Sequence, residues 1–150
     1  MQTTCSKTYP DFPFGHRQPS HAGHCRFVHG HNWSFHFTFE ADCLDECGFV
    51  VDFGGLQWLK ELLNWWFDHT TVLNEDDPLL DYFQRDDING GPDSMGLYDL
   101  RVVPDCSCEG LAKFVFELAD GALHLQTDGR VRVKALTLHE DSKNSATYSR

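Results

Sequence analysis

Residues 25–39 carry the pattern that most constrains the fold of this chain. From position 33 onward the odd positions are aromatic while most even ones are polar, an alternation typical of a strand with one buried face. The aromatic residues are Trp33, Phe35, Phe37 and Phe39. His29 and His31 share their odd parity, so in a strand that begins near His29 both imidazoles would point the same way at its end. Their side chains would then lie about 7 Å apart, a separation that suits two ligands converging on one ion.

A third imidazole ends an earlier stretch with the same alternation. Phe12, Phe14 and His16 alternate with Pro13 and Gly15, so His16 could end a strand whose inward face is formed by the two phenylalanines. Three neutral imidazoles without a fourth protein ligand describe a catalytic zinc site, which keeps one position open for water or substrate. The competing interpretation is that these histidines are ordinary surface or core residues.

The histidines belong to a wider pattern that resembles a known protein family. The pattern consists of His16, the motif Cys25-x3-His29-Gly30-His31 and the pair Asp68-His69. It resembles the 6-pyruvoyl-tetrahydropterin synthase superfamily and, within it, the 6-carboxy-tetrahydropterin synthases of queuosine and 7-deazaguanine biosynthesis. The resemblance covers nearly the whole chain. It implies an α+β tunnelling fold, with a four-stranded antiparallel sheet and two helices on one face (ββααββ), assembled through its sheets into an oligomeric barrel. Family members are commonly hexamers with active sites at subunit interfaces.

The resemblance also implies a metal centre and a reactive thiol. His16, His29 and His31 match the family's ligands of Zn²⁺, which would polarise the side-chain hydroxyls of a dihydropterin as a Lewis acid. Cys25 matches the catalytic cysteine. A thiol near a cation is partly thiolate and can take a proton from a carbon next to a polarised oxygen. A buried, inert thiol is the alternative for Cys25.

Five further residues match functional positions of the family. Asp68 and His69 match a proton relay in which the carboxylate orients or charges the imidazole, and in the family this pair and the cysteine usually meet across a subunit interface. Glu140 matches the glutamate that anchors the pterin's amino-pyrimidine ring, since adjacent N–H donors suit a two-oxygen acceptor. Glu109 matches a second glutamate near the pterin, and Ser107 keeps a hydroxyl where the family has threonine. The family's Asn-Pro-Thr-x-Glu reads Asp-Cys-Ser-Cys-Glu at 105–109, which leaves the shape of the pocket wall open.

The activity implied by the resemblance is that of a zinc-dependent lyase. It would convert 7,8-dihydroneopterin triphosphate to 6-carboxy-5,6,7,8-tetrahydropterin, acetaldehyde and triphosphate. Three residues separate Cys25 from His29, as in the 6-carboxy-tetrahydropterin synthases, whereas animal pyruvoyl synthases have a longer gap and another branch has glutamate in place of the cysteine. Two alternatives stay open: a 6-pyruvoyl-tetrahydropterin synthase, which eliminates triphosphate without cleaving the side chain, and a non-catalytic metal- or pterin-binding module.

Length and charge limit the remaining classes of function. We expect the 150 residues to form a single domain, 1–150. The net charge of −11 argues against nucleic acid as a partner, because nucleic-acid binding needs a basic surface. It also means that a triphosphate needs local basic groups, for which Arg17, Arg26 and Lys143 are the nearest candidates. No apolar run approaches the roughly 20 residues of a membrane helix, and the polar start does not resemble a signal peptide, so we expect a cytoplasmic protein without a membrane partner.

Six cysteines are present, at positions 5, 25, 43, 47, 106 and 108. Without a secretory signal we expect them to be reduced thiols. A second zinc site formed by Cys43-x3-Cys47 and Cys106-x-Cys108 is disfavoured, because neither pair has the two-residue gap of a zinc ribbon or knuckle.

Local patterns predict the elements of the chain. Strands are expected near 9–17, 29–41, 131–140 and 146–148, and helices at about 54–67, after a cap at Asp52, and 108–119, after a cap at Ser107 and before Asp120-Gly121. Pro10 and Pro13 would confine the first strand to an edge or a bulge. Residues 75–105 read as an acidic irregular insertion with a short helix around 79–84, and an active-site flap, a subunit contact and a solvated insertion are all compatible with this pattern.

Overall fold

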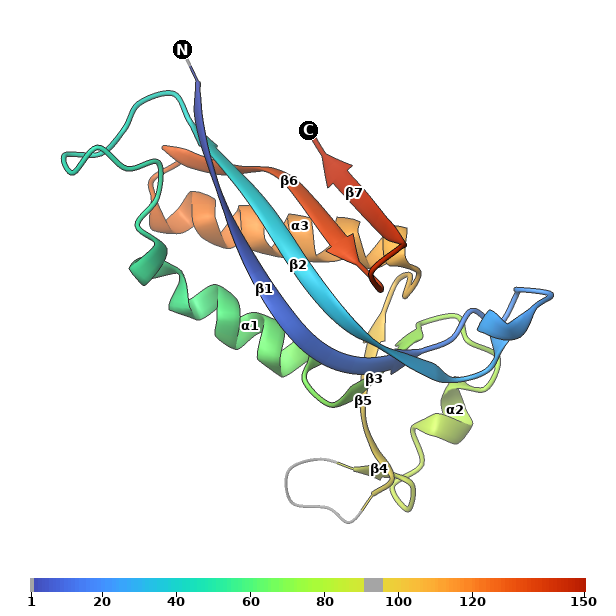
Figure 1. The fold of residues 1–150 in the computed structure, drawn as a ribbon. Coiled ribbons are helices and arrows are strands. Elements are labelled where there is room, and N and C mark those ends of the chain that lie inside the picture. Colours follow the sequence, from blue (N-terminus) through green and yellow to red (C-terminus); the bar gives the residue numbers. More distant parts are fainter. Residues whose placement is uncertain (1, 91–95) are drawn as a thin grey trace.

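The structure is a computed structural model that describes residues 2–90 and 96–150. Its strands form one sheet in the order β4-β5-β3-β1-β2-β6-β7, and its two long helices cover the same face of that sheet (Figure 1). The strands are β1 (Thr3–His16), β2 (His29–Ala41), β3 (Thr70–Asn74), β4 (Asn89–Gly90), β5 (Tyr98–Val103), β6 (Val131–His139) and β7 (Ser145–Ser149). The α-helices are α1 (Gln57–Phe67), α2 (Leu80–Phe83) and α3 (Cys108–Gln126), and short 3-10 turns span His24–Arg26 and Phe53–Leu56. The α+β class is therefore as expected.

The prediction of a four-stranded antiparallel sheet is wrong for the sheet as a whole. Strands β1, β2, β6 and β7 do pair antiparallel. However, β3 adds in parallel beside the end of β1, β5 pairs in parallel with β3, and β4 with β5, which gives a mixed sheet of seven strands in the described residues. All five residues of β3 are buried. A strand buried on both faces shows no alternation of polar and apolar residues, so its short sequence gave no strand signal.

A tight turn leads from α1 into this added part of the sheet. His69 has a positive φ of 58°, in the left-handed region that non-glycine residues seldom occupy. Its backbone N–H donates to the carbonyl of Pro13 at 2.9 Å. The chain therefore leaves the helix directly alongside β1 and continues as β3.

Several predicted boundaries also change. Strand β1 begins at Thr3 rather than near residue 9, and the expected irregularity appears as a shift in its pairing with β2 between Tyr9 and Phe12. Helix α3 continues through Asp120-Gly121 to Gln126. Its later turns bury Leu123, and the Asp120 carboxylate accepts from the backbone N–H of Val133 at 2.9 Å. These contacts outweigh the roughly 1 kcal/mol that glycine costs inside a helix.

The segment 75–105, expected to be an irregular insertion, contains α2, β4 and β5. Part of it, residues 91–95, lies outside the described residues. The short helix expected around 79–84 is present as α2. Strand β5 was not predicted because tertiary pairing, and not a local sequence pattern, holds it in the sheet. It pairs with β3, where Thr70 lies opposite Asp99 and Asn74 opposite Val103.

The core lies between the sheet and the two long helices. On β2 the aromatic positions are fully buried, with Trp33, Phe35 and Phe37 at 0% exposure. They pack in one cluster with apolar residues of α1 and α3; these include Leu59, Leu63, Phe67, Leu111, Val115 and Leu123. The intervening positions of β2, such as Ser34 and His36, face the opposite side of the sheet, which none of the described helices covers (Figure 1). The predicted parity of the strand is therefore confirmed.

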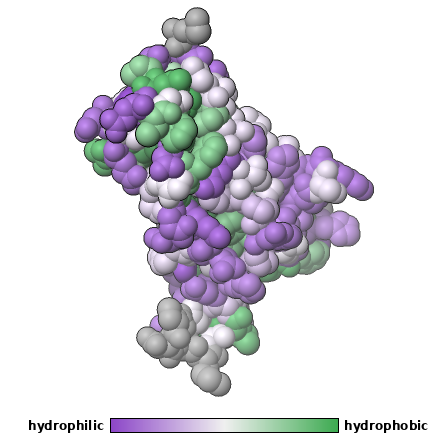
Figure 2. Space-filling model, turned by 60° about the vertical axis from the view of Figure 1, so that its left-hand side comes forward, coloured by the Kyte–Doolittle hydropathy of each residue, from purple (hydrophilic) through white to green (hydrophobic). Residues whose placement is uncertain are grey.

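On the face shown in Figure 2, an apolar area lies beside the amino-terminal end among mostly hydrophilic residues. A cavity of about 340 Å³ lies at this end of β1, and its lining includes the exposed side chains of Leu44, Phe49 and Phe53. Among the described residues, every helix is too short or too polar to cross a membrane.

Candidate metal centre

Antiparallel pairing of β1 with β2 brings the three histidines to one place. The register sets His16 opposite His29 and Phe14 opposite His31. The ring centroids lie 4.7 Å apart for His16 and His29, 5.5 Å for His16 and His31, and 5.0 Å for His29 and His31. Two strand ends that share an inward face thus place three imidazoles within reach of a single ion.

Backbone carbonyls orient two of these rings. His16 Nδ1 lies 2.8 Å from the carbonyl of Cys106, and His29 Nδ1 lies 2.7 Å from the carbonyl of Phe27. A neutral imidazole that donates from Nδ1 keeps a lone pair on Nε2, and such contacts commonly orient metal-binding histidines. Nε2 of His16 and of His31 are buried without a hydrogen-bond partner. Because a buried polar atom without a partner is costly, these two nitrogens fit a bound metal ion.

Burial also keeps His16 in the neutral form that binds metals. It lowers the pKa of His16 to about 4; the hydrogen bond with Cys106 opposes this shift, and the neighbouring charges of His29 and His31 add to it. At neutral pH the His16 ring is therefore an uncharged donor and needs to lose no proton on metal binding.

Glu140 completes the group from the turn after another strand. It follows β6, and its Oε1 lies 3.4 Å from His16 Nε2 and 3.2 Å from His31 Nε2. The ligand atoms of the three histidines and Glu140 all lie within 4.8 Å of one another. Three imidazoles and a carboxylate are a donor set that suits zinc and related divalent ions. This geometry allows Glu140 to be a fourth ligand as well as the predicted anchor of an organic ligand.

A cavity of about 480 Å³ lies beside this group. Its lining residues are His16, Gln18, Cys25, Ser107, Cys108, Glu109, Glu140, Lys143, Asn144 and Ser145. The cavity therefore unites one predicted metal ligand, the predicted catalytic cysteine and all three predicted substrate-binding residues, although these residues come from four separate parts of the chain.

The cavity contains two thiols in very different environments. Cys25 is exposed, within the turn His24–Arg26. Cys108 is partly buried, and its thiol donates to the carbonyl of Leu138 at 3.4 Å. Burial, assisted by the negative charges of Glu140 and Glu109, raises the pKa of Cys108 to about 12. Cys25 is thus the solvent-accessible thiol of this cavity, whereas burial keeps Cys108 protonated.

Asp68 and His69 do not line the Cys25 cavity. They form a pair of their own, with His69 Nδ1 2.6 Å from Asp68 Oδ1, and the two side chains are 83% and 48% exposed, respectively. They lie where α1 passes into β3, next to Pro13 of β1. Within one chain the predicted relay and the predicted cysteine are therefore separate.

The three basic candidates differ in their contacts. Arg17 is paired with Asp77, and Arg26 donates to carbonyls within its own loop, those of Ala22 and Gly23. Lys143 lines the cavity. Of the three, Lys143 is placed best to meet an anionic ligand there.

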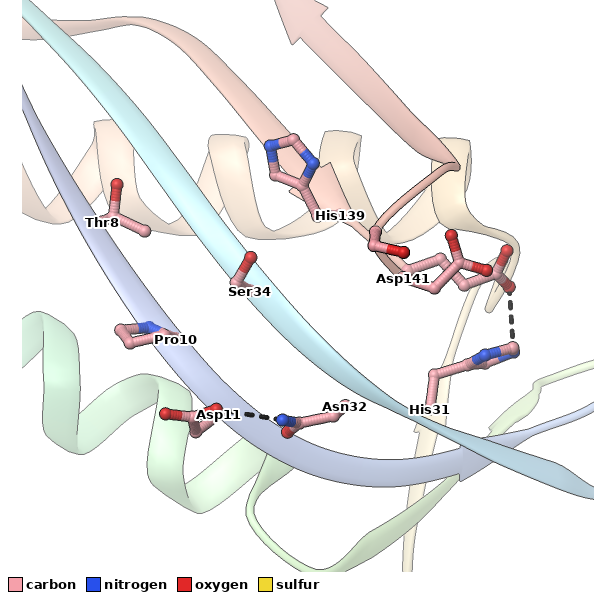
Figure 3. A pocket seen from close by; sticks show the side chains of 10 residues that line it. Thr8, Pro10, Asp11, His31, Asn32, Ser34, His139 and Asp141 are labelled. Atoms are coloured by element: carbon pink, nitrogen blue, oxygen red, sulfur yellow. Dashed lines mark hydrogen bonds and ion pairs between the residues drawn. The ribbon is translucent and has the colours of Figure 1, made fainter.

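A second, wider cavity of about 550 Å³ opens on the uncovered face of the sheet (Figure 3). Asn32 donates to Asp11 there at 2.9 Å, and the dashed line at His31 marks the close approach of its Nε2 to Glu140 Oε1. Glu140 lines both cavities. The carboxylate thus lies between the two openings, a position that could not be inferred without the pairing of β6 with β2.

The protein is thus of the α+β class, with a histidine-rich group that could hold a metal ion next to an exposed thiol. The family model described as 6-pyruvoyl tetrahydropterin synthase matches residues 4–150. Because the match covers nearly all of the sequence, the chain belongs to that family.

Curated relatives carry a more specific name. A protein from Rickettsia typhi named 6-carboxy-5,6,7,8-tetrahydropterin synthase is 39% identical over 71 residues, which are 45% of this chain and 49% of that protein. A protein of the same name from Bacillus subtilis is 38% identical over 66 residues, 44% of this chain and 40% of that protein. The chain thus matches about half of the length of these relatives or less.

Solved structures share the fold. An uncharacterized protein from Wolinella succinogenes has a TM-score of 0.81 at 23% identity, with 100% of this chain and 99% of that chain covered. The 6-pyruvoyl tetrahydropterin synthase of Plasmodium vivax has a TM-score of 0.68 at 18% identity, with 99% and 98% covered. At these identities the likeness shows the fold alone.

Proposed function

We propose that this protein is a zinc-dependent lyase that converts 7,8-dihydroneopterin triphosphate and one water to 6-carboxy-5,6,7,8-tetrahydropterin, acetaldehyde and triphosphate. The observation that carries this proposal is the convergence of three imidazoles and Glu140 beside a cavity that also contains an exposed thiol. The name of the curated relatives supports the 6-carboxy product. The proposal places the protein in queuosine or 7-deazaguanine biosynthesis.

The residues of the cavity have distinct roles in this proposal. His16, His29 and His31 hold the zinc, which when bound supplies a Lewis acid for the substrate's side-chain hydroxyls. Cys25 removes a proton from the carbon next to the polarised oxygen. The Glu140 carboxylate accepts hydrogen bonds from adjacent N–H groups of the pterin ring.

The remaining groups shape the cavity around the substrate. Glu109 and Ser107 form the wall near the ring, at the start of α3. Lys143, in the turn between β6 and β7, is available to the triphosphate, so that a chain with net charge −11 still offers a local positive charge.

We further propose a homo-oligomer, a hexamer by family resemblance, in which Asp68 and His69 act on the substrate bound beside Cys25 of a neighbouring subunit. The separation of this pair from the Cys25 cavity within one chain supports the arrangement. The proposal places the protein in the cytoplasm, where cysteines such as the exposed Cys25 stay reduced. Nucleic acid and membranes are not partners in this proposal.

A 6-pyruvoyl-tetrahydropterin synthase is the second candidate. The family model that matches residues 4–150 is described as 6-pyruvoyl tetrahydropterin synthase, which favours this candidate. The alignment to the protein of Rickettsia typhi, which has the 6-carboxy name, covers only 45% of the chain. The two candidates share the metal centre and differ in whether the substrate's side chain is cleaved. The products therefore distinguish them.

Two variants test the assignment of roles. Cys25→Ala should keep zinc at one ion per chain and lose turnover by at least about 100-fold, while His31→Ala should lose zinc itself, as measured by atomic absorption after dialysis. Cys43→Ala, which removes another exposed thiol, is the matched control and should behave like the wild type. Full turnover by zinc-loaded Cys25→Ala would contradict the proposed mechanism and favour a non-catalytic metal- or pterin-binding module.

A further inference from the structure

The guanidinium of Arg17 is held by a buried carboxylate next to the metal centre. Arg17 follows His16, the last residue of β1. Its Nε donates to Oδ2 of Asp77 at 2.7 Å, and its Nη2 donates to Oδ1 at 2.9 Å. The Asp77 side chain is 0% exposed and that of Arg17 is 13% exposed. Two parallel bonds fix orientation as well as distance, so this guanidinium is committed to Asp77 and is not available to a triphosphate.

The remaining nitrogen of the same guanidinium reaches the loop that carries Cys25. Arg17 Nη1 donates to the carbonyl of Arg26 at 3.2 Å, directly after Cys25 in the turn His24–Arg26. The backbone N–H of Gln18 donates to the carbonyl of Cys25 at 2.7 Å. The Arg26 guanidinium itself donates to loop carbonyls and lies over the ring of Phe27. The position of Cys25 relative to the end of β1 therefore depends on Arg17 and Gln18.

Asp77 is itself fixed to the strand layer. Its Oδ1 also accepts from the backbone N–H of Leu79 at 2.8 Å, and its own N–H donates to the carbonyl of Asn74, the end of β3, at 3.1 Å. The Asn74 side-chain oxygen accepts from the N–H of Cys106 at 2.7 Å. The Cys106 carbonyl in turn contacts His16 Nδ1 at 2.8 Å. One hydrogen-bonded unit thus joins the carboxylate, the guanidinium and a metal-facing imidazole.

We infer that Arg17, oriented by Asp77, is a positioning residue that holds the Cys25 turn at a fixed place beside the three-histidine centre. The inference rests on the proposed function, because it assigns Cys25 to the reaction. It also gives the start of the acidic segment 75–105 a definite role: the segment supplies the carboxylate that orients the residue after His16. Arg17 acts through Cys25 and does not itself touch the substrate.

The test compares the purified, zinc-loaded variants Asp77→Asn and Arg17→Lys with the wild type. Asp77→Asn keeps the shape of the side chain and removes its charge, while Arg17→Lys keeps the charge and removes the planar fork. The matched control is Asp87→Asn, because Asp87 makes the same two-bond pair with Arg85 on the exposed surface, where the side chains are 61% and 52% exposed. For each variant we would measure kcat, KM, zinc content and amide hydrogen exchange of peptides covering 18–28 and 111–123.

For Asp77→Asn and Arg17→Lys we expect kcat to fall about 10- to 100-fold, the range expected for a reacting group misplaced by about 1 Å, with KM within about twofold. Zinc content should stay at the wild-type value. Amides of 18–28 should exchange faster while those of 111–123, in α3, keep their protection, because the loss is local. Asp87→Asn should match the wild type in every measurement.

Two results would overturn the inference. If exchange in 18–28 rises while kcat is unchanged, the tether does not position a reacting group. If exchange rises equally in both peptides, or zinc is lost, the pair is only a structural support. Because the exchange measurement needs no substrate, it still tests the tether if the wild type shows no turnover, and in that case the proposed function fails rather than the tether.

Discussion

Replacing Glu140 by glutamine tests the role of the carboxylate that lies between the two cavities. Its Oε1 is 3.2 Å from His31 Nε2 and the side chain is 23% exposed. As an anchor the Glu140 carboxylate accepts two hydrogen bonds from N–H groups of the pterin ring. A hydrogen bond to a charged group contributes about 1.5–3 kcal/mol. Glutamine keeps one acceptor oxygen, turns an N–H toward the second donor and removes the charge. Because water reaches a quarter of the side chain, we take the middle of this range, about 2 kcal/mol, which corresponds to a fall of about 30-fold in kcat/KM.

The assay measures kcat/KM and zinc content on the same preparation. Three imidazoles remain in Glu140→Gln, so zinc should stay near one ion per chain. Glu117→Gln removes an exposed negative charge from α3, where the side chain is 58% exposed, and should leave both quantities unchanged. Loss of zinc from Glu140→Gln with unchanged kcat/KM after zinc is restored would show that Glu140 is a metal ligand and would refute the anchoring argument.

Three further predictions concern thiols, acid stability and a helix. Iodoacetamide at pH 7.5 should label Cys25 in the native protein while Cys108, whose pKa burial raises to about 12, reacts only after unfolding; equal labelling rates in peptide mass spectrometry would contradict this. The hydrogen bond from Arg132 lowers the pKa of Glu40 although burial opposes the shift, so Glu40→Gln should lower the unfolding free energy by about 1–2 kcal/mol at pH 7. This difference should shrink as the pH falls below about 4.3, because Glu40 is then protonated in the unfolded chain. A difference that does not change with pH would contradict this prediction. Gly121, in α3, has no neighbouring atoms within 4 Å of an added Cβ, so Gly121→Ala should stabilise by about 0.5–1 kcal/mol, and a lower urea midpoint would be the opposite result.

The alternation of residues was enough to predict how the histidines meet. His16 ends one strand and His29 begins the next, and antiparallel pairing of consecutive strands necessarily places those ends side by side. The position of Glu140 depends instead on the register of β6 against β2, where Ser34 lies opposite His139. The pairing register of two strands cannot be read from a local sequence pattern. Glu140 could therefore be identified from the sequence only through its match to the family.

The predictions that failed share a physical cause. Strand β3 is buried along its whole length, and α3 runs through Gly121 because Leu123 packs into the core. In β3 tertiary contacts form the strand although the local sequence shows no strand pattern. In α3 they extend the helix although the local sequence contains a glycine that disfavours it. Arg17 shows the same limit within the site: its position suggested a phosphate contact, and only the fold brings Asp77 to it.

Whether the three-histidine centre and Cys25 form an active site can be measured in one turnover assay on 7,8-dihydroneopterin triphosphate, with zinc supplied or chelated and the products separated by chromatography. We expect 6-carboxy-5,6,7,8-tetrahydropterin and acetaldehyde in equal amounts, formed when zinc is supplied and absent when it is chelated. A 6-pyruvoyl product without acetaldehyde would favour the second candidate. No turnover by the zinc-loaded protein would contradict the claim that the three-histidine centre and Cys25 form an active site.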